Sequence, residues 1–279
     1  MKLKHILRIG AVAFASILLL TACGSKSSKK TVTLATVGTT NPFSYEKKGK
    51  LTGYDIEVAK EVFKASDKYD VKYQKTEWTS IFSGLDSDKY QIGANNISYT
   101  KERANKYLYS NPTASNPLVL VVPKDSDIKS YNDIAGHSTQ VVQGNTTVPM
   151  LQKFNKNHEN NQVKLNFTSE DLAHQIRNVS DGKYDFKIFE KISAETIIKE
   201  QGLDNLKVID LPSDQKPYVY FIFAQDQKDL QKFVNKRLKK LYENGTLEKL
   251  SKKYLGGSYL PDKKEIGRAS CRERVLWVV

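Results

Sequence analysis

The sequence is poor in the residues that cross-link small folds or bind metals. Its 279 residues include only two cysteines, Cys23 and Cys271, which lie near opposite ends of the chain. The body between them therefore has no disulfide framework and no thiol chemistry, and its stability has to come from a hydrophobic core. The four histidines show neither i, i+4 pairing nor metal-ligand spacing, so we expect no metal site and no cofactor.

Long hydrophobic runs are also absent. The most apolar stretch, residues 9–20, has twelve residues, whereas a membrane-spanning helix needs about twenty. Lys2, Lys4 and Arg8 precede this stretch, and small residues follow it. A basic start, a short apolar run and small residues are typical of a signal peptide, which we predict at residues 1–22.

The residues at the end of this segment, Leu20-Thr21-Ala22-Cys23, resemble the bacterial lipobox. The resemblance implies that Cys23 carries a diacylglycerol, with palmitate among its acyl chains, and anchors the protein on the extracellular face of the cell membrane. Residues 23–30 would then form a flexible polar tether. The alternative is a plain secretory signal with an incidental cysteine.

Acidic residues are too few to balance the basic ones. The chain has 44 Lys and Arg residues against 31 Asp and Glu, for a formal net charge of +13. The basic residues neither form a single stripe nor alternate with stacking aromatics, so we expect a solvated surface and no nucleic-acid partner. With 39% hydrophobic residues the composition is that of an ordinary globular protein, and we expect a monomer.

What the sequence does contain is an alternation of strand and helix patterns. The first half is typical of a βαβαβ unit, with elements predicted at 31–38, 55–66, 71–75, 79–85 and 90–97. Such a unit predicts a parallel sheet. A second α/β pattern follows, with strands predicted at 140–142, 163–167 and 184–189 and helices at 169–179 and 192–201. The predicted fold class is therefore α/β.

Two polar, proline-containing segments, 111–117 and 211–217, interrupt this pattern. Each is a candidate crossover between domains. Two crossovers predict two lobes with a binding cleft between them, lobe one comprising 31–115 and 217–259 and lobe two comprising 118–212. The sequence at 262–279 ends in an apolar cluster that follows no such pattern, and we interpret it as a non-native tail.

The stretch Ala94-to-Ser110, ANNISYTKERANKYLYS, contains a candidate anion site. Thr100 is a good N-cap for a short helix, which places Arg103 in the first helical turn. A cation there opposes the helix dipole, so Arg103 is predicted to face an anion such as an α-carboxylate, with Ser98 and the Asn96 backbone nearby. The alternative is a surface arginine paired with Glu102 or Asp88.

Two further candidates lie in the second half. Alternation along the strand predicted at 184–189 places Glu190 at its C-terminal end, where open α/β sheets bind ligands. The alternative is a solvated Glu190 paired with Lys187 or Lys191. The loop at 144–147 precedes a helix, predicted to start at Pro149, whose N-terminal amides are suited to an anion.

From Thr31 to about Tyr259 the chain resembles the polar amino acid-binding group of the extracellular solute-binding proteins of ABC importers. The matching segments are NPFSY at 41, LTGYDIEVAKEVF at 51, EWTSIFSGLDSDKYQIGANNISYTKERANKYLYSNP at 77, VVQGNTT at 141 and DGKYDFKIFE at 181. The resemblance implies the two-lobed type II periplasmic-binding-protein-like fold. It also implies a membrane permease and its ATPase as partners.

The resemblance assigns roles residue by residue. Arg103 would bind the ligand α-carboxylate, helped by Ser98, and Trp78 would be an aromatic wall for the ligand side chain. Lobe two would contribute Asn145 and Thr146 from the loop after its first strand, and Glu190 would bind the α-ammonium together with carbonyl groups near Asn96. For Trp78 the alternative is an ordinary core tryptophan.

Ligand and activity are open at this stage. Thr40, Asn145 and Glu190 depart from the residues usual in the family, and no carboxylate is obviously placed to select lysine or arginine. We therefore expect a neutral polar amino acid or cystine. The alternatives to a receptor are an enzyme on the same fold, such as a dehydratase, and an adhesin or signalling lipoprotein.

Overall fold

The computed structural model describes residues 29–64, 66–212 and 217–266. The predicted signal peptide, Cys23 and most of the predicted tail lie outside these residues. Lys30, expected at the end of the tether, is instead the first residue of a strand and pairs with Tyr69. Residues 263–265 form a short 3-10 helix (η3, Lys263–Glu265), in which Glu265 is buried.

The larger sheet has the order β5-β1-β6-β14-β7, and β8 also pairs with β14. Its strands are β1 (Lys30–Thr36), β5 (Tyr69–Lys75), β6 (Ile92–Ser98), β7 (Leu108–Tyr109), β8 (Ala114–Ser115) and β14 (Tyr218–Phe223). The parallel pairing expected of the βαβαβ unit is confirmed for β1 with β5 and β6. The sheet is mixed, because β14 returns from the far end of the chain and runs antiparallel to β6.

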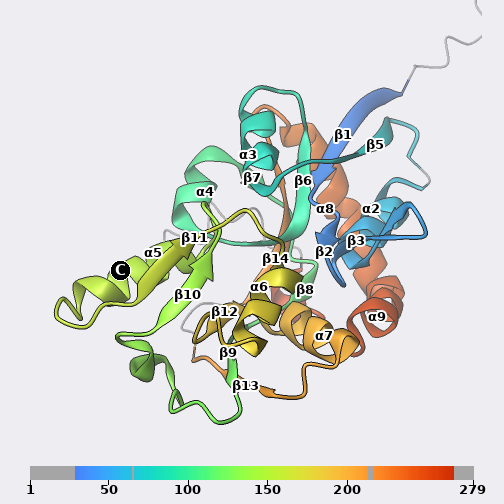
Figure 1. Cartoon of the computed structure of the whole chain (residues 1–279). Coiled ribbons are helices and arrows are strands. Elements are labelled where there is room, and N and C mark those ends of the chain that lie inside the picture. Colours follow the sequence, from blue (N-terminus) through green and yellow to red (C-terminus); the bar gives the residue numbers. More distant parts are fainter. Residues whose placement is uncertain (1–28, 65, 213–216, 267–279) are drawn as a thin grey trace, which may run out of the picture.

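Helices cover both faces of this sheet (Figure 1). Alternation in β1 sends Val32 and Leu34 to one face and Ala35 to the other. The first face packs on α2 (Tyr54–Phe63), α8 (Lys228–Glu243) and α9 (Thr246–Leu250), which continues into η2 (Ser251–Leu255). The second face packs on α3 (Trp78–Asp86). Helix α4 (Lys101–Lys106) follows the C-terminal end of β6.

The remaining sheets are built from the middle of the chain. An antiparallel sheet of order β12-β9-β13 is formed by β9 (Leu118–Pro123), β12 (Lys187–Glu190) and β13 (Leu206–Asp210). A parallel pair joins β10 (Ser138–Val141) to β11 (Lys164–Phe167). Around them lie η1 (Tyr131–Ile134), α5 (Thr147–Lys156), α6 (Leu172–Ser180) and α7 (Lys191–Gln201). The two faces of β9 pack into different cores, with Leu120 toward α5 and Val121 toward α6 and α7.

A small antiparallel sheet, β2 (Thr39–Thr40), β3 (Ser44–Lys47) and β4 (Lys50–Thr52), precedes α2. Gly53 joins it to the helix at a φ of 117°, where an added Cβ would lie 2.5 Å from the Phe43 carbonyl oxygen. Only glycine fits this position without strain.

Several element boundaries differ from the sequence predictions. The helix predicted at 169–179 begins at Leu172, because the Asp171 side chain accepts a hydrogen bond from the His174 N–H and caps it. The strand predicted at 184–189 begins at Lys187. The helix expected to start at Pro149 begins at Thr147. No helix in the described ranges has the length and hydrophobicity needed to cross a membrane.

Candidate functional site

A cleft of about 520 Å³ lies between the larger sheet and the elements of residues 118–210. The structure brings all seven predicted ligand-binding residues to its wall. They are Trp78, Asn96, Ser98, Arg103, Asn145, Thr146 and Glu190. Their contribution to ligand binding stays a prediction, but residues more than a hundred positions apart in the sequence, Trp78 and Glu190, line the same cleft.

Arg103 is held at the cleft from both sides. The Thr100 hydroxyl accepts a hydrogen bond of 3.0 Å from the Arg103 N–H, which confirms Thr100 as the N-cap of α4. The guanidinium donates to the Ser98 carbonyl at 3.1 Å and, across the cleft, to the Gly144 carbonyl at 2.7 Å. It also lies over the rings of Trp78 and Phe82, 5.3 and 5.1 Å from their centroids.

The surface ion pair considered for Arg103 is not formed. Its side chain is only 8% exposed, and no carboxylate of the described residues lies within ion-pair distance of it. Burial lowers the pKa of the guanidinium from its usual value, although an arginine stays protonated. A buried guanidinium bonded only to carbonyl groups is suited to an incoming anion.

Glu190 lies opposite, as the residue that precedes α7. Its Oε1 accepts a hydrogen bond of 3.2 Å from the Ser98 hydroxyl, while its Oε2 is buried without a partner among the described residues. Burial raises the pKa of the carboxyl group. The ion pairs considered for Glu190 are also not formed, because Lys191 pairs with Asp210 at 2.8 Å and Lys187 points into the core.

Lys187 is a buried cation that sequence reasoning did not identify as such. Its Nζ donates to the Gln140 carbonyl at 2.8 Å and to Gln175 Oε1 at 2.6 Å. Burial lowers its pKa to about 7. Gln175 is 3% exposed and lines the cleft. The hydrogen bond from Lys187 therefore holds the side-chain amide of a cleft residue in place.

Asn96 has a left-handed backbone, with a φ of 51°. Its N–H donates to Asp55 Oδ2 at 2.6 Å, and this carboxyl group is fully buried at the base of α2. Burial raises the pKa of Asp55 to about 7, although the hydrogen bond from Asn96 opposes the shift. Asp55 thus holds the backbone of a cleft residue in a conformation that asparagine tolerates better than most residues.

Further groups at the cleft have unused hydrogen-bonding capacity. The Trp78 Nε1–H and the Thr147 hydroxyl are both buried without a partner in the described part of the chain. Thr147 is the first residue of α5, whose N-terminus has no side-chain cap. Trp78 is partly buried: it lines the cleft and packs edge-on against Phe82, 5.0 Å between ring centroids. Its role as a wall for the ligand side chain stays a prediction.

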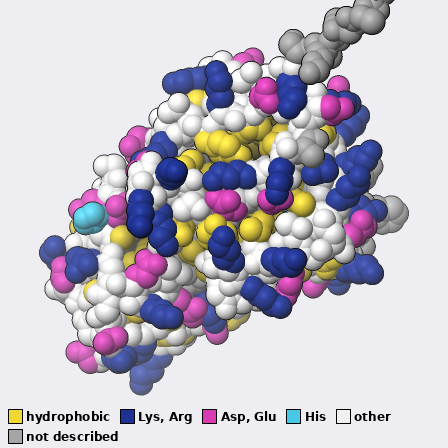
Figure 2. All heavy atoms as spheres, turned by 90° about the vertical axis from the view of Figure 1, so that its right-hand side faces the viewer, with side chains coloured by type: hydrophobic (Ala, Val, Ile, Leu, Met, Phe, Trp, Pro, Cys, Tyr) yellow, Lys and Arg dark blue, Asp and Glu magenta, His cyan; other side chains and the backbone are white. Residues whose placement is uncertain are grey.

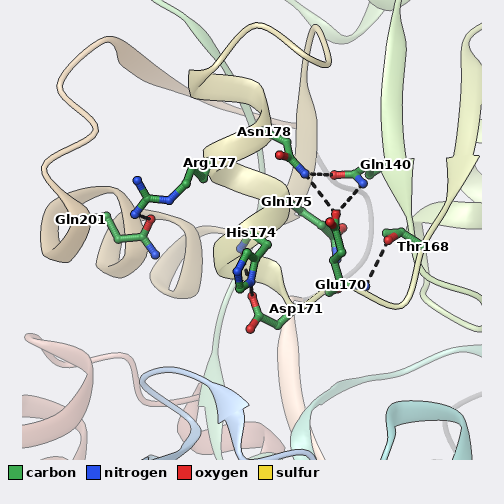
Figure 3. A network of polar contacts seen from close by, with 9 residues as sticks. All are labelled: Gln140, Thr168, Glu170, Asp171, His174, Gln175, Arg177, Asn178 and Gln201. Atoms are coloured by element: carbon green, nitrogen blue, oxygen red, sulfur yellow. Dashed lines mark hydrogen bonds and ion pairs between the residues drawn. The ribbon is translucent and has the colours of Figure 1, made fainter.

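The sequence did not identify several polar residues at the cleft. Thr147, Gln175, Glu77, Glu170 and Asp171 all line it. Figure 3 shows that the Glu170 carboxylate turns toward Gln140 and Asn178, which donate to its Oε2 at 2.7 and 3.0 Å. Asp171 is occupied by the cap of α6 and by His174. Helical spacing could have identified Gln175, because it lies on the same buried face of α6 as Leu172 and Val179.

Residues 32–257 match the family model of the bacterial extracellular solute-binding proteins, family 3. The L-cystine-binding protein TcyA of Bacillus subtilis is 34% identical over 235 residues, which cover 83% of this chain and 84% of that protein. The probable amino-acid-binding protein YxeM of Bacillus subtilis is 32% identical over 265 residues, or 91% of this chain and 96% of that protein.

Solved structures agree with this similarity. A chain from a study of glutathione import in Gram-positive bacteria, via GshT and the cystine ABC importer TcyBC of Streptococcus mutans, is 99% identical. It matches with a TM-score of 0.84 over 85% of this chain and 99% of its own. A putative L-cystine ABC transporter protein from Listeria monocytogenes is 27% identical, with a TM-score of 0.74 over 83% of this chain and 98% of its own.

Proposed function

The chain belongs to family 3 of the bacterial extracellular solute-binding proteins, and we propose that it captures a cystine-like or glutathione-like ligand as the receptor of an ABC importer. The observation that carries this proposal is the complementary pair of buried groups in one cleft. Arg103 presents a cation without a carboxylate partner, and Glu190 presents an unpaired carboxylate oxygen. Together they fit the two charges of an α-amino acid group.

In this proposal the ligand carboxylate binds Arg103 and the N-terminus of α5 at Thr146 and Thr147. The Arg103 donor that now bonds the Gly144 carbonyl would turn to the ligand. The ligand ammonium binds Glu190 and backbone carbonyl groups near Asn96. Helix N-termini favour anions because their first N–H groups lack partners within the helix.

The ligand class rests on the relatives. Several are named for L-cystine, and the 99% identical chain comes from work on glutathione import. Cystine and glutathione share one feature, a free α-amino acid group next to a sulfur-containing remainder. Trp78 would form the wall for that remainder.

Ligand bridging across the cleft would favour a closed state of two lobes, comprising 31–115 with 217–259 and 118–212. A ligand shifts this equilibrium only if it binds the closed state more tightly. The permease and its ATPase would recognise the closed, ligand-bound state. We also propose that Cys23 anchors the protein through lipid, that the protein is monomeric, and that it returns its ligand unchanged, unlike an enzyme.

The surface charge suits this setting. On the face shown in Figure 2, Lys and Arg side chains are interspersed with acidic and apolar side chains. This face therefore presents no continuous basic stripe of the kind that binds nucleic acid.

Calorimetric titration of residues 29–266 with L-cystine, reduced glutathione, glutathione disulfide and the twenty amino acids would test the proposal. This body corresponds closely to the share of the chain that the 99% identical structure covers. Arg103→Ala should weaken binding of the preferred ligand at least a hundredfold, because two charge-assisted hydrogen bonds contribute about 3 kcal/mol or more. Recovery of unchanged ligand from the mixture would separate a receptor from an enzyme.

Arg177→Ala is the matched control. Arg177 carries the same charge, lies in α6 outside the cleft wall and bonds Gln201. If Arg103→Ala binds as tightly as Arg177→Ala, the carboxylate clamp is wrong. If no amino acid, cystine or glutathione binds the parent, the ligand class is wrong and an adhesin or signalling role has to be reconsidered.

A further inference from the structure

Asn116 lies in the first crossover, between β8 and β9, and its side-chain amide is used at both ends. The Nδ2 group donates to Asn96 Oδ1 at 3.1 Å, and the Oδ1 atom accepts from the Ile192 N–H at 3.0 Å. Asn116 is 3% exposed, and both bonds are buried. One amide therefore joins β6, in the larger sheet, to the start of α7. Helix α7 belongs to the second group of elements, the sheets and helices of residues 118–210.

The bond to Asn96 extends into a buried chain of contacts. Asn96 lines the cleft, and its own N–H is held by Asp55 in α2. Its backbone is left-handed, so its side chain and its peptide groups are oriented by these two partners rather than by a regular strand. Asn116 thus contacts a cleft residue whose conformation is already constrained.

The bond to Ile192 acts next to Glu190. Glu190 is the N-cap residue of α7, and the following N–H groups need partners outside the helix. Lys191 N–H donates to the Pro117 carbonyl at 2.7 Å, and Ile192 N–H donates to Asn116. Two consecutive residues of the crossover therefore fix the backbone that carries the Glu190 carboxylate.

We propose that Asn116 is a positioning residue that couples ligand binding to closure, because its amide sets the placement of Asn96 relative to Glu190. This proposal rests on the proposed function. Asn116 does not line the cleft, so it acts through the two residues that it holds. An amide is required, because one end has to donate to a side-chain oxygen while the other accepts from a backbone N–H.

The surrounding groups are able to change partners. Asp55 Oδ1, Asn96 Nδ2 and the Ser193 hydroxyl are all buried without a partner among the described residues. Buried polar groups normally find partners. Spare donors and acceptors on α2, β6 and α7 are what a junction needs if its elements rotate against each other when the cleft opens.

The test compares Asn116→Ala with Asn155→Ala in the body of residues 29–266. Asn155 is a matched control, since its amide also donates at one end and accepts at the other: Nδ2 donates to the Val163 carbonyl at 2.9 Å, and Oδ1 accepts from the Val163 N–H at 2.8 Å. Both of these contacts lie within the middle of the chain, away from the crossovers. The body lacks Cys23 and Cys271, so cysteines introduced at the exposed positions Lys72 and Glu159 can carry spin labels.

Two readouts decide the outcome. Asn116→Ala should raise the Kd for L-cystine or glutathione about tenfold, as expected for the loss of two hydrogen bonds, and should lengthen or broaden the label distance in ligand-free protein. Asn155→Ala should lower the Tm by about as much as Asn116→Ala does, but it should leave the Kd and the label distance at the parent's values.

Equal Kd values and equal distances for the two variants would overturn the proposal. The ligand-free distance separates this failure from that of the proposed function. If neither ligand binds the parent, the ligand class fails, and the distance in Asn116→Ala still decides whether Asn116 sets the arrangement of the two groups of elements.

Discussion

At the scale of single residues, the buried carboxyl group of Asp55 has an unusual consequence. Burial raises its pKa to about 7, from 3.8 for an exposed aspartate. Between pH 3.8 and about pH 7, Asp55 is protonated in the folded protein and ionised in the unfolded chain. The free energy of unfolding therefore falls as the pH rises through this window, which is the opposite of the behaviour of a salt-bridged aspartate.

We predict that Asp55→Asn removes this pH dependence. Relative to the variant, the parent should lose about 2 kcal/mol of unfolding free energy between pH 5 and pH 7, measured by urea denaturation. Lys187 does not obscure the result, because its lowered pKa, about 7, affects stability mainly above that pH. The exposed Asp229→Asn should follow the parent, and a parallel pH profile for Asp55→Asn would contradict the prediction.

Trp78 offers an optical test of the cleft. It is the sole tryptophan of residues 29–266, since the second one is Trp277. Its unpaired Nε1–H lies at the cleft, so ligand binding should change its environment and its emission. We expect a saturable change in fluorescence that Trp78→Phe abolishes. Calorimetric saturation without any change in emission would show that the ligand does not reach Trp78.

At the scale of elements, the site depends on short helices that begin at the cleft. The N-cap of α4 orients Arg103, and the uncapped start of α5 presents its N–H groups. Helix α4 has only six residues, so it depends on its cap and its packing more than on intrinsic helix propensity.

We predict that Thr100→Ala lowers the free energy of unfolding by about 1 kcal/mol and also weakens ligand binding, because the cap bonds the Arg103 N–H directly. Thr100→Ser keeps the hydroxyl and should stay within a few tenths of a kcal/mol of the parent. Urea denaturation and titration of the two variants give the comparison. Equal behaviour of Ala and Ser would mean that the cap does not support the site.

At the scale of the whole molecule, contacts join the two groups of elements at both ends of α7. Ser98 bonds Glu190 at the start of the helix, and Asn41 donates to Glu200 at 2.7 Å near its end. Together with the bond from Arg103 to Gly144, these contacts connect the larger sheet and its neighbours to the elements of residues 118–210. A ligand that replaces some of these hydrogen bonds has to contact both walls of the cleft.

We predict that saturating ligand stabilises the closed molecule. At a hundredfold excess over Kd it should add about 2.7 kcal/mol, which corresponds to a rise in Tm of about 5–10 °C. Small-angle scattering should show a smaller radius of gyration with ligand. At the same concentration Arg103→Ala, whose Kd is at least a hundredfold higher, should be at most half-saturated and gain no more than about 0.4 kcal/mol. An unchanged radius in the parent would contradict closure.

The sequence by itself determined the α/β class, the family, and most of the local structure of the site. Hydrophobic periodicity and the Thr100 cap are local signals, and the segments around Arg103 and Glu190 carry the family motif. All seven predicted ligand-binding residues consequently line one cleft. The residues that were missed, such as Thr147 and Gln175, reach it through the exact position of a helix start or a helix face.

Only the tertiary structure decided which charges are paired and which are buried. Glu190 has two lysines close by in the sequence, but one pairs with Asp210 and the other enters the core. Asp55 is buried, and Asn116 joins Asn96 to Ile192, which lies 76 residues beyond Asn116 in the chain. Sequence patterns could not predict these outcomes, because burial and pairing depend on contacts between distant segments, whereas periodicity and capping act within a few residues.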